Sequence, residues 1–216
     1  MLCEVRQTAS GLRAEFAILE GGEAIGGALF PDNFLFGGPC ACRYRGEELY
    51  LSYRRQPPLQ NLGKAVEQRV WAPYTVARGG ETVGEMCDKL ARSGPFSRYG
   101  YTAMTLDGAQ LEMFEMGLGR QGVAYPIWAG GRQITQIEKP CVARDNLDAC
   151  TLCSLGEWAQ RAAVLLCLYL DARAYARRGQ IAVASVEKRC LLTFNKAVKA
   201  KYDPGFHRRA APLQGP

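Results

Sequence analysis

Ala162-Ala-Val-Leu-Leu-Cys-Leu-Tyr-Leu170 is a run of nine residues without a charged side chain, bracketed by Arg161 and Asp171. Over more than two helical turns the run offers no polar stripe that could face water, and a helix that is apolar on all sides is a buried one. Nine residues fall far short of the roughly 20 that a membrane-spanning helix requires. We therefore expect a buried central helix, with a short membrane-inserted segment as the alternative.

The sequence around this run indicates where the helix begins and ends. Ser154 and Glu157 have the spacing of a capping box, in which each side chain satisfies an orphan backbone N–H at the start of a helix. Arginines in the last turns interact favourably with the negative end of the helix dipole, and Gly179 can adopt the left-handed conformation that ends a helix. The pattern predicts a helix over 155–178, about 36 Å long at 1.5 Å per residue.

A thirteen-residue motif recurs three times without gaps, beginning at Ala14, Ala72 and Val123. Each copy places an aromatic residue and, two positions later, a β-branched residue on one face of a strand. These residues are Phe16 and Ile18, Tyr74 and Val76, and Tyr125 and Ile127. A Gly-Gly pair follows at 21–22, 79–80 and 130–131. Because glycine readily adopts the positive φ of a tight turn, the repetition predicts three related hairpins.

Hairpins of a second kind are indicated after each copy; in the first two of them, polar and apolar residues alternate about a turn. They span 40–53, 99–114 and 138–152, with turns expected at Arg45-Gly46, Asp107-Gly108 and Asp145-Asn146. A sheet of about a dozen antiparallel strands tends to close, because closure removes its edges, and its lumen is too wide for side chains alone to fill. The sequence therefore predicts a mainly β fold, a closed antiparallel barrel of about twelve strands around a central hydrophobic C-terminal helix.

The repeated unit of aromatic-x-aliphatic, turn, Gly-Gly and aliphatic-Gly, followed late in the chain by an apolar helix, resembles the tubby C-terminal-like superfamily. This superfamily includes the LURP-one-related proteins and the phospholipid scramblases. The resemblance covers residues 1 to about 180 and implies a closed twelve-stranded barrel around a central helix. Tubby proteins bind phosphoinositide head groups and scramblases act at membranes with calcium, but no segment here matches either ligand-binding motif, so no site residue is carried over.

The predicted organisation has three parts. A tubby-like barrel with its central helix occupies 1–180, a basic extension over 181–209 packs on the barrel or is partly mobile, and 210–216 form a disordered tail. From Ala172 onwards the chain has ten Lys and Arg against two acidic residues, whereas the first 171 residues have 17 against 19. Such an asymmetry suggests a surface for phosphates, acidic lipid heads or an acidic partner, with a solvated tail as the alternative. The candidate anionic-ligand residues are Lys188, Arg189, Lys196, Lys199 and Lys201.

Catalytic and metal chemistry find little support in the sequence. His207 is the only histidine and is expected in a mobile tail, which argues against Ser-His-Asp, Cys-His and histidine-zinc sites. Cys150 and Cys153 have the spacing of a redox or zinc pair, but no second pair exists, and residues three apart in a strand face opposite sides. We expect most of the nine cysteines to be buried free thiols, with no catalytic residue, metal or cofactor; a role for Cys150 and Cys153 stays open.

The leading hypothesis is a non-enzymatic intracellular binding or adaptor protein for anionic phospholipid head groups, phosphoinositides included, at a membrane surface. Residues 1–10 contain no hydrophobic run, so no signal peptide is visible and we expect a cytoplasmic, peripherally membrane-associated protein. One alternative is a small-molecule-binding protein or an enzyme whose polar groups converge only in three dimensions. Another is a structural protein-interaction module. Nucleic acid is disfavoured, because no reading motif is present and neutralised phosphates alone give nonspecific affinity.

Overall fold

A computed structural model describes residues 1–9, 13–31, 38–57, 59–140, 147–178 and 192–210, without the side chains of 174–178. Within these residues all strands belong to one antiparallel sheet. The strands are β1 (Leu2–Ala9), β2 (Ala14–Glu20), β3 (Glu23–Phe30), β4 (Cys40–Tyr44), β5 (Glu47–Tyr53), β6 (Trp71–Arg78), β7 (Glu81–Arg92), β8 (Arg98–Leu106), β9 (Ala109–Phe114), β10 (Met116–Gly117), β11 (Val123–Ala129), β12 (Arg132–Lys139) and β13 (Ala149–Ser154). Because β9 also pairs with β11, twelve of them close into a ring, and β10 is a two-residue strand beside it. The predicted barrel is confirmed.

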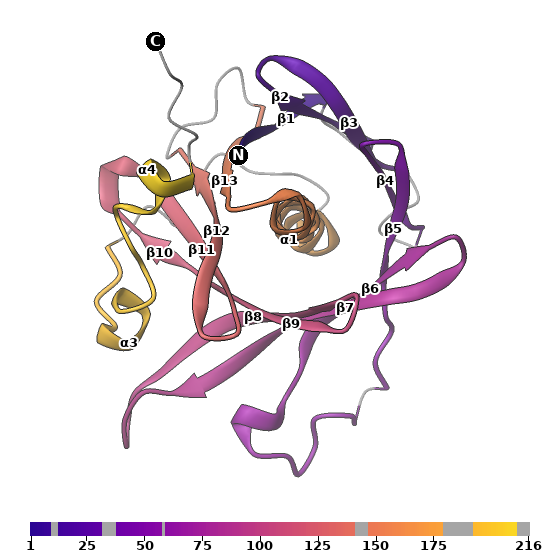
Figure 1. Cartoon of the computed structure of the whole chain (residues 1–216). Helices are drawn as coiled ribbons and strands as arrows, with labels where there is room; N and C mark the ends of the chain where they lie inside the picture. The colour runs from indigo at the N-terminus through magenta and orange to yellow at the C-terminus, as the bar shows by residue number, and fades with distance from the viewer. Residues whose placement is uncertain (10–12, 32–37, 58, 141–146, 179–191, 211–216) are drawn as a thin grey trace.

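The helix α1 (Glu157–Arg178) lies inside this ring of strands (Figure 1). Residues 162–170 are each no more than 3% exposed, as the apolar run predicts. They pack against the inward-facing side chains of every repeat, among them Ile18, Val76 and Ile127, each 0% exposed. The helix thus fills a lumen that the strands alone would leave empty. Among the described residues, no helix combines the length and the apolar composition that crossing a bilayer requires.

The predicted start of the helix near Leu155 is wrong by two residues. Ser154 ends β13, and its hydroxyl lies 2.7 Å from the Thr135 hydroxyl on the neighbouring strand. The side chain that would have capped the helix is therefore committed to the sheet. The first helical backbone bond runs instead from the Gln160 N–H to the Gly156 carbonyl at 2.9 Å.

All three Gly-Gly pairs form hairpin tips, with φ angles between 54° and 89°. The hairpins are β2–β3, β6–β7 and β11–β12. Each also shifts its register two residues after the repeated aromatic, between Ile18 and Leu19, between Val76 and Ala77, and between Ile127 and Trp128. The repeat therefore includes a β-bulge, which increases the local twist and bends the strand as barrel closure requires.

The hairpins of the second kind are β4–β5 and β8–β9, with positive φ at Arg45-Gly46 and Asp107-Gly108 as predicted. Strands β12 and β13 pair as expected, although the turn predicted at Asp145-Asn146 lies outside the described residues. Strand β1 pairs with β13 and β2. It thereby takes the fourth place in the third repeat, so that the barrel consists of three four-stranded units.

The C-terminal segment 192–210 lies against the outside of the barrel and contains two short helices, α3 (Lys196–Lys199) and α4 (Phe206–Ala210) (Figure 1). Val198 packs in a cluster with Phe114 and Met116, and Phe206 is 0% exposed beside Cys153. The described part of the basic extension is thus packed on the barrel. The prediction that His207 lies in a mobile tail is wrong, because the buried neighbour Phe206 holds this segment against the barrel. The tail at 211–216 lies outside the described residues.

The seven cysteines in the described residues are all free, and all but Cys87 are buried. Cys150 and Cys153 face opposite sides of β13, as predicted. Cys150 points inward into the core that also contains Cys167 of α1, whereas Cys153 points outward to the cluster of Phe206.

Candidate functional site

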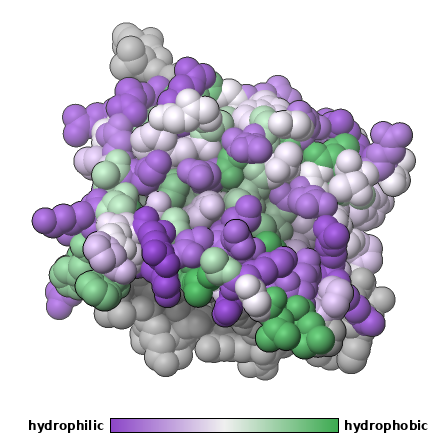
Figure 2. Space-filling view, turned by 90° about the horizontal axis from the view of Figure 1, so that it is seen from below, coloured by the Kyte–Doolittle hydropathy of each residue, from purple (hydrophilic) through white to green (hydrophobic). Residues whose placement is uncertain are grey.

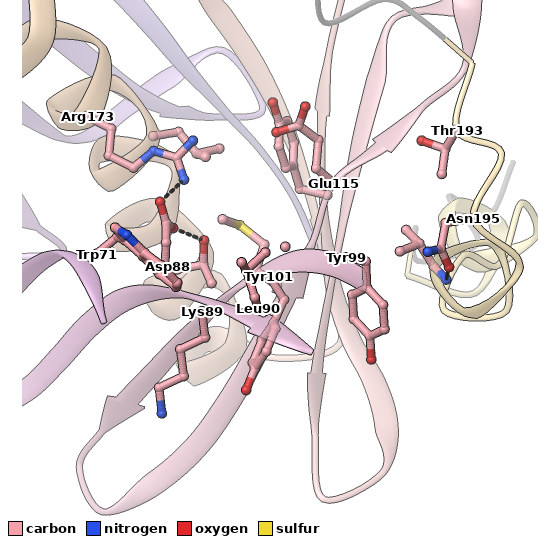
Figure 3. A pocket seen from close by; sticks show the side chains of 16 residues that line it. Trp71, Asp88, Lys89, Leu90, Tyr99, Tyr101, Glu115, Arg173, Thr193 and Asn195 are labelled. Carbon is pink, nitrogen blue, oxygen red and sulfur yellow. Dashed lines mark hydrogen bonds and ion pairs between the residues drawn. The ribbon is translucent and has the colours of Figure 1, made fainter. Parts of the chain in front are cut away.

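A pocket of about 510 Å³ opens beside the C-terminal half of α1, between β7, β8 and the segment that leads to α3 (Figure 3). Its walls carry aromatic side chains, among them Trp71, Tyr99 and Tyr101. Asp88 and Arg173 contribute charged groups to its lining. Largely apolar concavities with a few placed polar groups are typical of small-molecule sites.

Asp88 organises the polar side of this pocket. Its carboxylate accepts hydrogen bonds from Arg173 Nη1 at 2.6 Å, from the Thr102 hydroxyl at 2.9 Å and from the Tyr169 hydroxyl at 3.1 Å. Burial alone would lower the pKa of Arg173, but the attraction of Asp88 outweighs it and the pKa is raised. Arg173 and Asp88 therefore form a hydrogen-bonded ion pair that carries no net charge.

The backbone beside the pocket is strained at Ala72, which has φ of 44° although it is not glycine. The register of β6 shifts here, between Trp71 and Tyr74, and the Tyr169 hydroxyl, whose single proton is shared with Asp88, lies 2.9 Å from the Ala72 carbonyl oxygen. A bulge of this kind re-aims the side chain next to it. It accompanies the placement of Trp71 in the pocket wall.

The remaining charged side chains of the pocket do not make it a phosphate site. Lys89 points its ammonium away from the Asp88–Arg173 pair, and Glu115 adds a second carboxylate on another wall (Figure 3). The described lining thus has no excess positive charge. The pocket fits an amphipathic molecule better than an anion.

Next to the pocket, hydrogen bonds and ion pairs join three surface segments, residues 59–69, 92–98 and 192–199, which together we call the end lobe. Asn195 donates to the Ser93 hydroxyl at 3.1 Å, and Glu67 accepts from Arg92 Nε at 2.7 Å. These bonds tie the C-terminal segment and the short helix η2 (Val66–Gln68) to the ends of β7 and β8. In Figure 1 these strand ends and the η2 segment extend below the barrel.

The end lobe is both apolar and basic. The five most exposed large hydrophobic side chains of the described residues all lie in it: Leu59 at 70%, Leu62 at 75%, Phe96 at 103%, Leu192 at 58% and Phe194 at 80%. Its charged residues are Lys64, Arg69, Arg92, Arg98, Lys196 and Lys199, against the single acidic residue Glu67. Figure 2 views the molecule from this side and shows hydrophobic patches near the edges of a largely hydrophilic face.

The structure separates the five candidate cations of the sequence. Lys196 and Lys199 are exposed in the end lobe, where Lys199 Nζ lies 5.8 Å from the ring centre of Phe194. Lys201 lies outside the lobe, half-buried, with Nζ 4.7 Å from the Trp128 ring centre. Two further candidates, Lys188 and Arg189, lie outside the described residues.

Sequence reasoning missed Leu59, Leu62 and Phe96, the exposed apolar residues that the end lobe takes from outside the C-terminal segment. Phe96 stands alone among Ser, Gly, Pro and Arg, and Leu59 and Leu62 follow the Pro57-Pro58 pair in a polar segment. An isolated apolar residue in such a turn-rich segment was the only local sign that its side chain is exposed. The hydrogen bonds from Asn195 to Ser93 and Ser97 join the turn of Phe96 to the segment of Phe194, and no local pattern in the sequence predicts them.

Comparisons of the chain with models of protein families, with curated proteins and with solved structures find no match. The membership of the tubby-like superfamily that the sequence suggests therefore stays a prediction, and the site has to be interpreted from its own geometry.

Proposed function

We propose that this protein is a membrane-binding module that docks its end lobe on an anionic phospholipid surface. The observation that carries the proposal is the coincidence, in one lobe, of the five most exposed hydrophobic side chains and six basic residues. Exposed apolar patches rimmed by polar residues mark interaction sites. The excess of basic over acidic residues selects a negatively charged partner.

A bilayer rich in acidic lipids uses both properties of the lobe. Basic residues near such a surface contribute about 1 kcal/mol each. Phe96 and Phe194 can insert their rings among the acyl chains, where burial of an exposed aromatic side chain stabilises binding by about 1.5–3 kcal/mol. Lys196 and Lys199 are then close enough to the head groups to contact phosphates.

Vesicle co-sedimentation tests the proposal. The full chain should bind vesicles of phosphatidylcholine with phosphatidylserine at low salt, and bind pure phosphatidylcholine vesicles much less. The double variants Lys196→Glu/Lys199→Glu and Phe96→Ser/Phe194→Ser should each lose most of this binding.

Matched controls come from the other end of the barrel, beside the Gly-Gly tips and the start of α1. Arg132→Glu reverses the charge of an exposed residue there, and Leu155→Ser removes a side chain that is 48% exposed. Both controls should bind like the wild type. Wild-type protein that stays in the supernatant with anionic vesicles, or lobe variants that bind as well as the controls, would disprove membrane docking through this lobe.

A second candidate function, binding of a small amphipathic molecule, is favoured by the pocket itself. Its volume of about 510 Å³ suits a small ligand, and its Asp88–Arg173 pair offers hydrogen-bonding groups on a mostly apolar wall. Gly100 lines the pocket, and a Cβ there would meet nothing nearer than 3.9 Å. Native mass spectrometry of the purified protein should detect a bound molecule that Gly100→Phe displaces; an unoccupied wild-type protein would argue against this candidate.

A further inference from the structure

The outer face of β12 and β13 holds a cluster of side chains that neither the end lobe nor the pocket uses. Glu138 and Cys153 lie on this face, because alternation along the two paired strands directs Ile137 and Leu152, both 0% exposed, into the barrel. His207 approaches the same face from α4. The three residues come together only because α4 packs on this face of the barrel.

Three potential metal ligands converge here. Cys153 Sγ lies 3.1 Å from His207 Nδ1, which lies 3.8 Å from Glu138 Oε1, and all three atoms are within 4.8 Å of one another. A tetrahedral zinc ion with sulfur at about 2.3 Å and nitrogen and oxygen at about 2.0–2.2 Å keeps its ligand atoms roughly 3.3–3.6 Å apart. The observed separations bracket this range, so small side-chain adjustments would complete the site.

The surroundings hold the ligands in position. Gln136 donates to Glu138 Oε1 at 2.8 Å, and Gln133 in turn donates to Gln136 Oε1 at 2.9 Å. A hydrogen-bonded neighbour of this kind orients a carboxylate ligand. Phe206, 0% exposed, fixes α4 on the barrel and with it the imidazole of His207.

The same cluster is poorly arranged for a cysteine hydrolase. In such an enzyme the acid binds the imidazole nitrogen opposite to the one that faces the thiol. Here Cys153 and Glu138 both face Nδ1 of His207. Burial, with the charge of Glu138, also raises the pKa of the Cys153 thiol to about 12, which opposes a free thiolate nucleophile.

We propose that Glu138, Cys153 and His207 bind one Zn²⁺ ion, with water in the fourth position. One thiolate, one imidazole and one carboxylate form a donor set that zinc accepts. The Glu138 and His207 side chains are 39% and 48% exposed, so water has access to the fourth position. The ion displaces the thiol proton on binding. It clamps α4, and thus the C-terminal segment, to the barrel independently of any membrane role.

Zinc titration of the full, metal-free chain against a competing fluorescent chelator tests this proposal. One equivalent should bind, and Co²⁺ in its place should show a thiolate-to-cobalt charge-transfer band. Cys153→Ser and His207→Gln should each weaken zinc binding by at least about tenfold, by analogy with the loss caused even by outer-sphere changes. Cys153→Ser should also abolish the cobalt band.

Two controls separate the site from other thiols and charges. Cys87→Ser removes a half-buried cysteine on another strand, and Arg208→Gln changes an exposed neighbour of His207. Both should bind zinc like the wild type and keep the cobalt band. His207 is exposed, so His207→Gln should fold normally, which circular dichroism verifies. No zinc binding by the wild type, or equal binding by Cys153→Ser and His207→Gln, would overturn the proposal.

Discussion

Arg45 and Asp107 occupy the same place in two of the three repeats, each as the first turn residue with φ of 48°, yet they carry opposite charges. The first turns of α1 match this inversion. Arg45 Nε lies 3.8 Å from Glu157 Oε1, and Asp107 forms an ion pair with Arg161. The two repeats therefore distinguish the faces of the helix by charge, which favours one rotation of α1 in the barrel.

Arg161 should be the most important of these helix charges. Its side chain is 17% exposed and also pairs with Glu47 at 2.8 Å, so replacing it leaves two partly buried carboxylates with Arg78 alone. We expect Arg161→Met to lower the free energy of unfolding by about 1–3 kcal/mol. Urea denaturation measures this loss, and Arg132→Met at an exposed position should change the stability by less than about 0.5 kcal/mol.

The same ion pairs should make the protein sensitive to acid. Burial raises the pKa of Glu47, but hydrogen bonds from Arg78 and Arg161 outweigh it and the pKa is lowered. A lowered carboxyl pKa gives stability that is present above the unfolded value of about 4.3 and lost as the pH falls. Arg161→Met should therefore lose less stability than the wild type between neutral pH and acid. An identical pH profile would contradict this account.

Another prediction concerns Gly84, which directly follows the β-bulge of its hairpin. A Cβ there would lie 2.5 Å from the Thr105 carbonyl oxygen, and at the equivalent Gly26 only 2.0 Å from the Arg43 carbonyl oxygen. Gly84→Ala and Gly26→Ala should each cost at least about 1–3 kcal/mol, because the strands must separate to admit a methyl group.

Gly100→Ala is the matched control, since it lies in a strand of the same barrel with no atom nearer than 3.9 Å to the new Cβ. Thermal unfolding should show it to be neutral or slightly more stable, because alanine restricts the unfolded chain. Equal midpoints for Gly84→Ala and Gly100→Ala would show that close strand approach is not what selects glycine.

The sequence was sufficient for the barrel because its signals are local. The Gly-Gly tips, the Asp107-Gly108 turn and the apolar run at 162–170 each depend on residues adjacent in the chain. The prediction of the helix start failed because the Ser154 hydroxyl had two possible hydrogen-bond partners. It bonds to the Thr135 hydroxyl on the neighbouring strand and not to a backbone N–H of the helix.

The candidate sites could not be predicted in this way. His207 and Cys153 are 54 residues apart, and their contact exists only because Phe206 packs on the outside of β13. Likewise, Phe96 and Phe194 belong to one lobe because Asn195 bonds to Ser93. Sequence periodicity describes how an element buries one face, but not which later segment covers the other.

A further prediction concerns a cluster of buried charged side chains around Lys139, the last residue of β12. Lys139 pairs with Asp148 and with Asp171 of α1, whose Oδ1 is 3.5 Å from the ammonium. Lys139→Met would leave two buried carboxylates without this cation, and should cost about 3–5 kcal/mol. Guanidinium denaturation measures this. Lys89→Met, at a half-buried lysine, is the control and should cost much less.

Asp171 gives this cluster a distinct pH dependence. Burial raises its pKa to about 7, although Lys139 lowers it. Because the pKa is raised, the folded state keeps a proton that the unfolded state releases. The contribution of this group to the stability of the folded state is therefore lost as the pH rises from about 4 to about 7. The stability of the wild type relative to Asp171→Asn should fall over this interval. A difference that stays constant, or that grows with pH, would contradict burial as the dominant effect.

The final prediction separates the two forces by which the end lobe binds membranes. Charges on its surface are screened over about 10 Å at 0.1 M salt but over only about 3 Å at 1 M, whereas insertion of Phe96 and Phe194 does not depend on screening. Raising the salt over this range should weaken binding of the wild type to anionic vesicles. Phe96→Ser/Phe194→Ser should bind more weakly at every salt concentration with the same salt slope, while Lys196→Glu/Lys199→Glu should flatten the slope. Co-sedimentation at several salt concentrations measures both quantities. If the lysine variant kept the wild-type slope, Lys196 and Lys199 would not face the lipid head groups and the orientation of the lobe on the membrane would have to be revised.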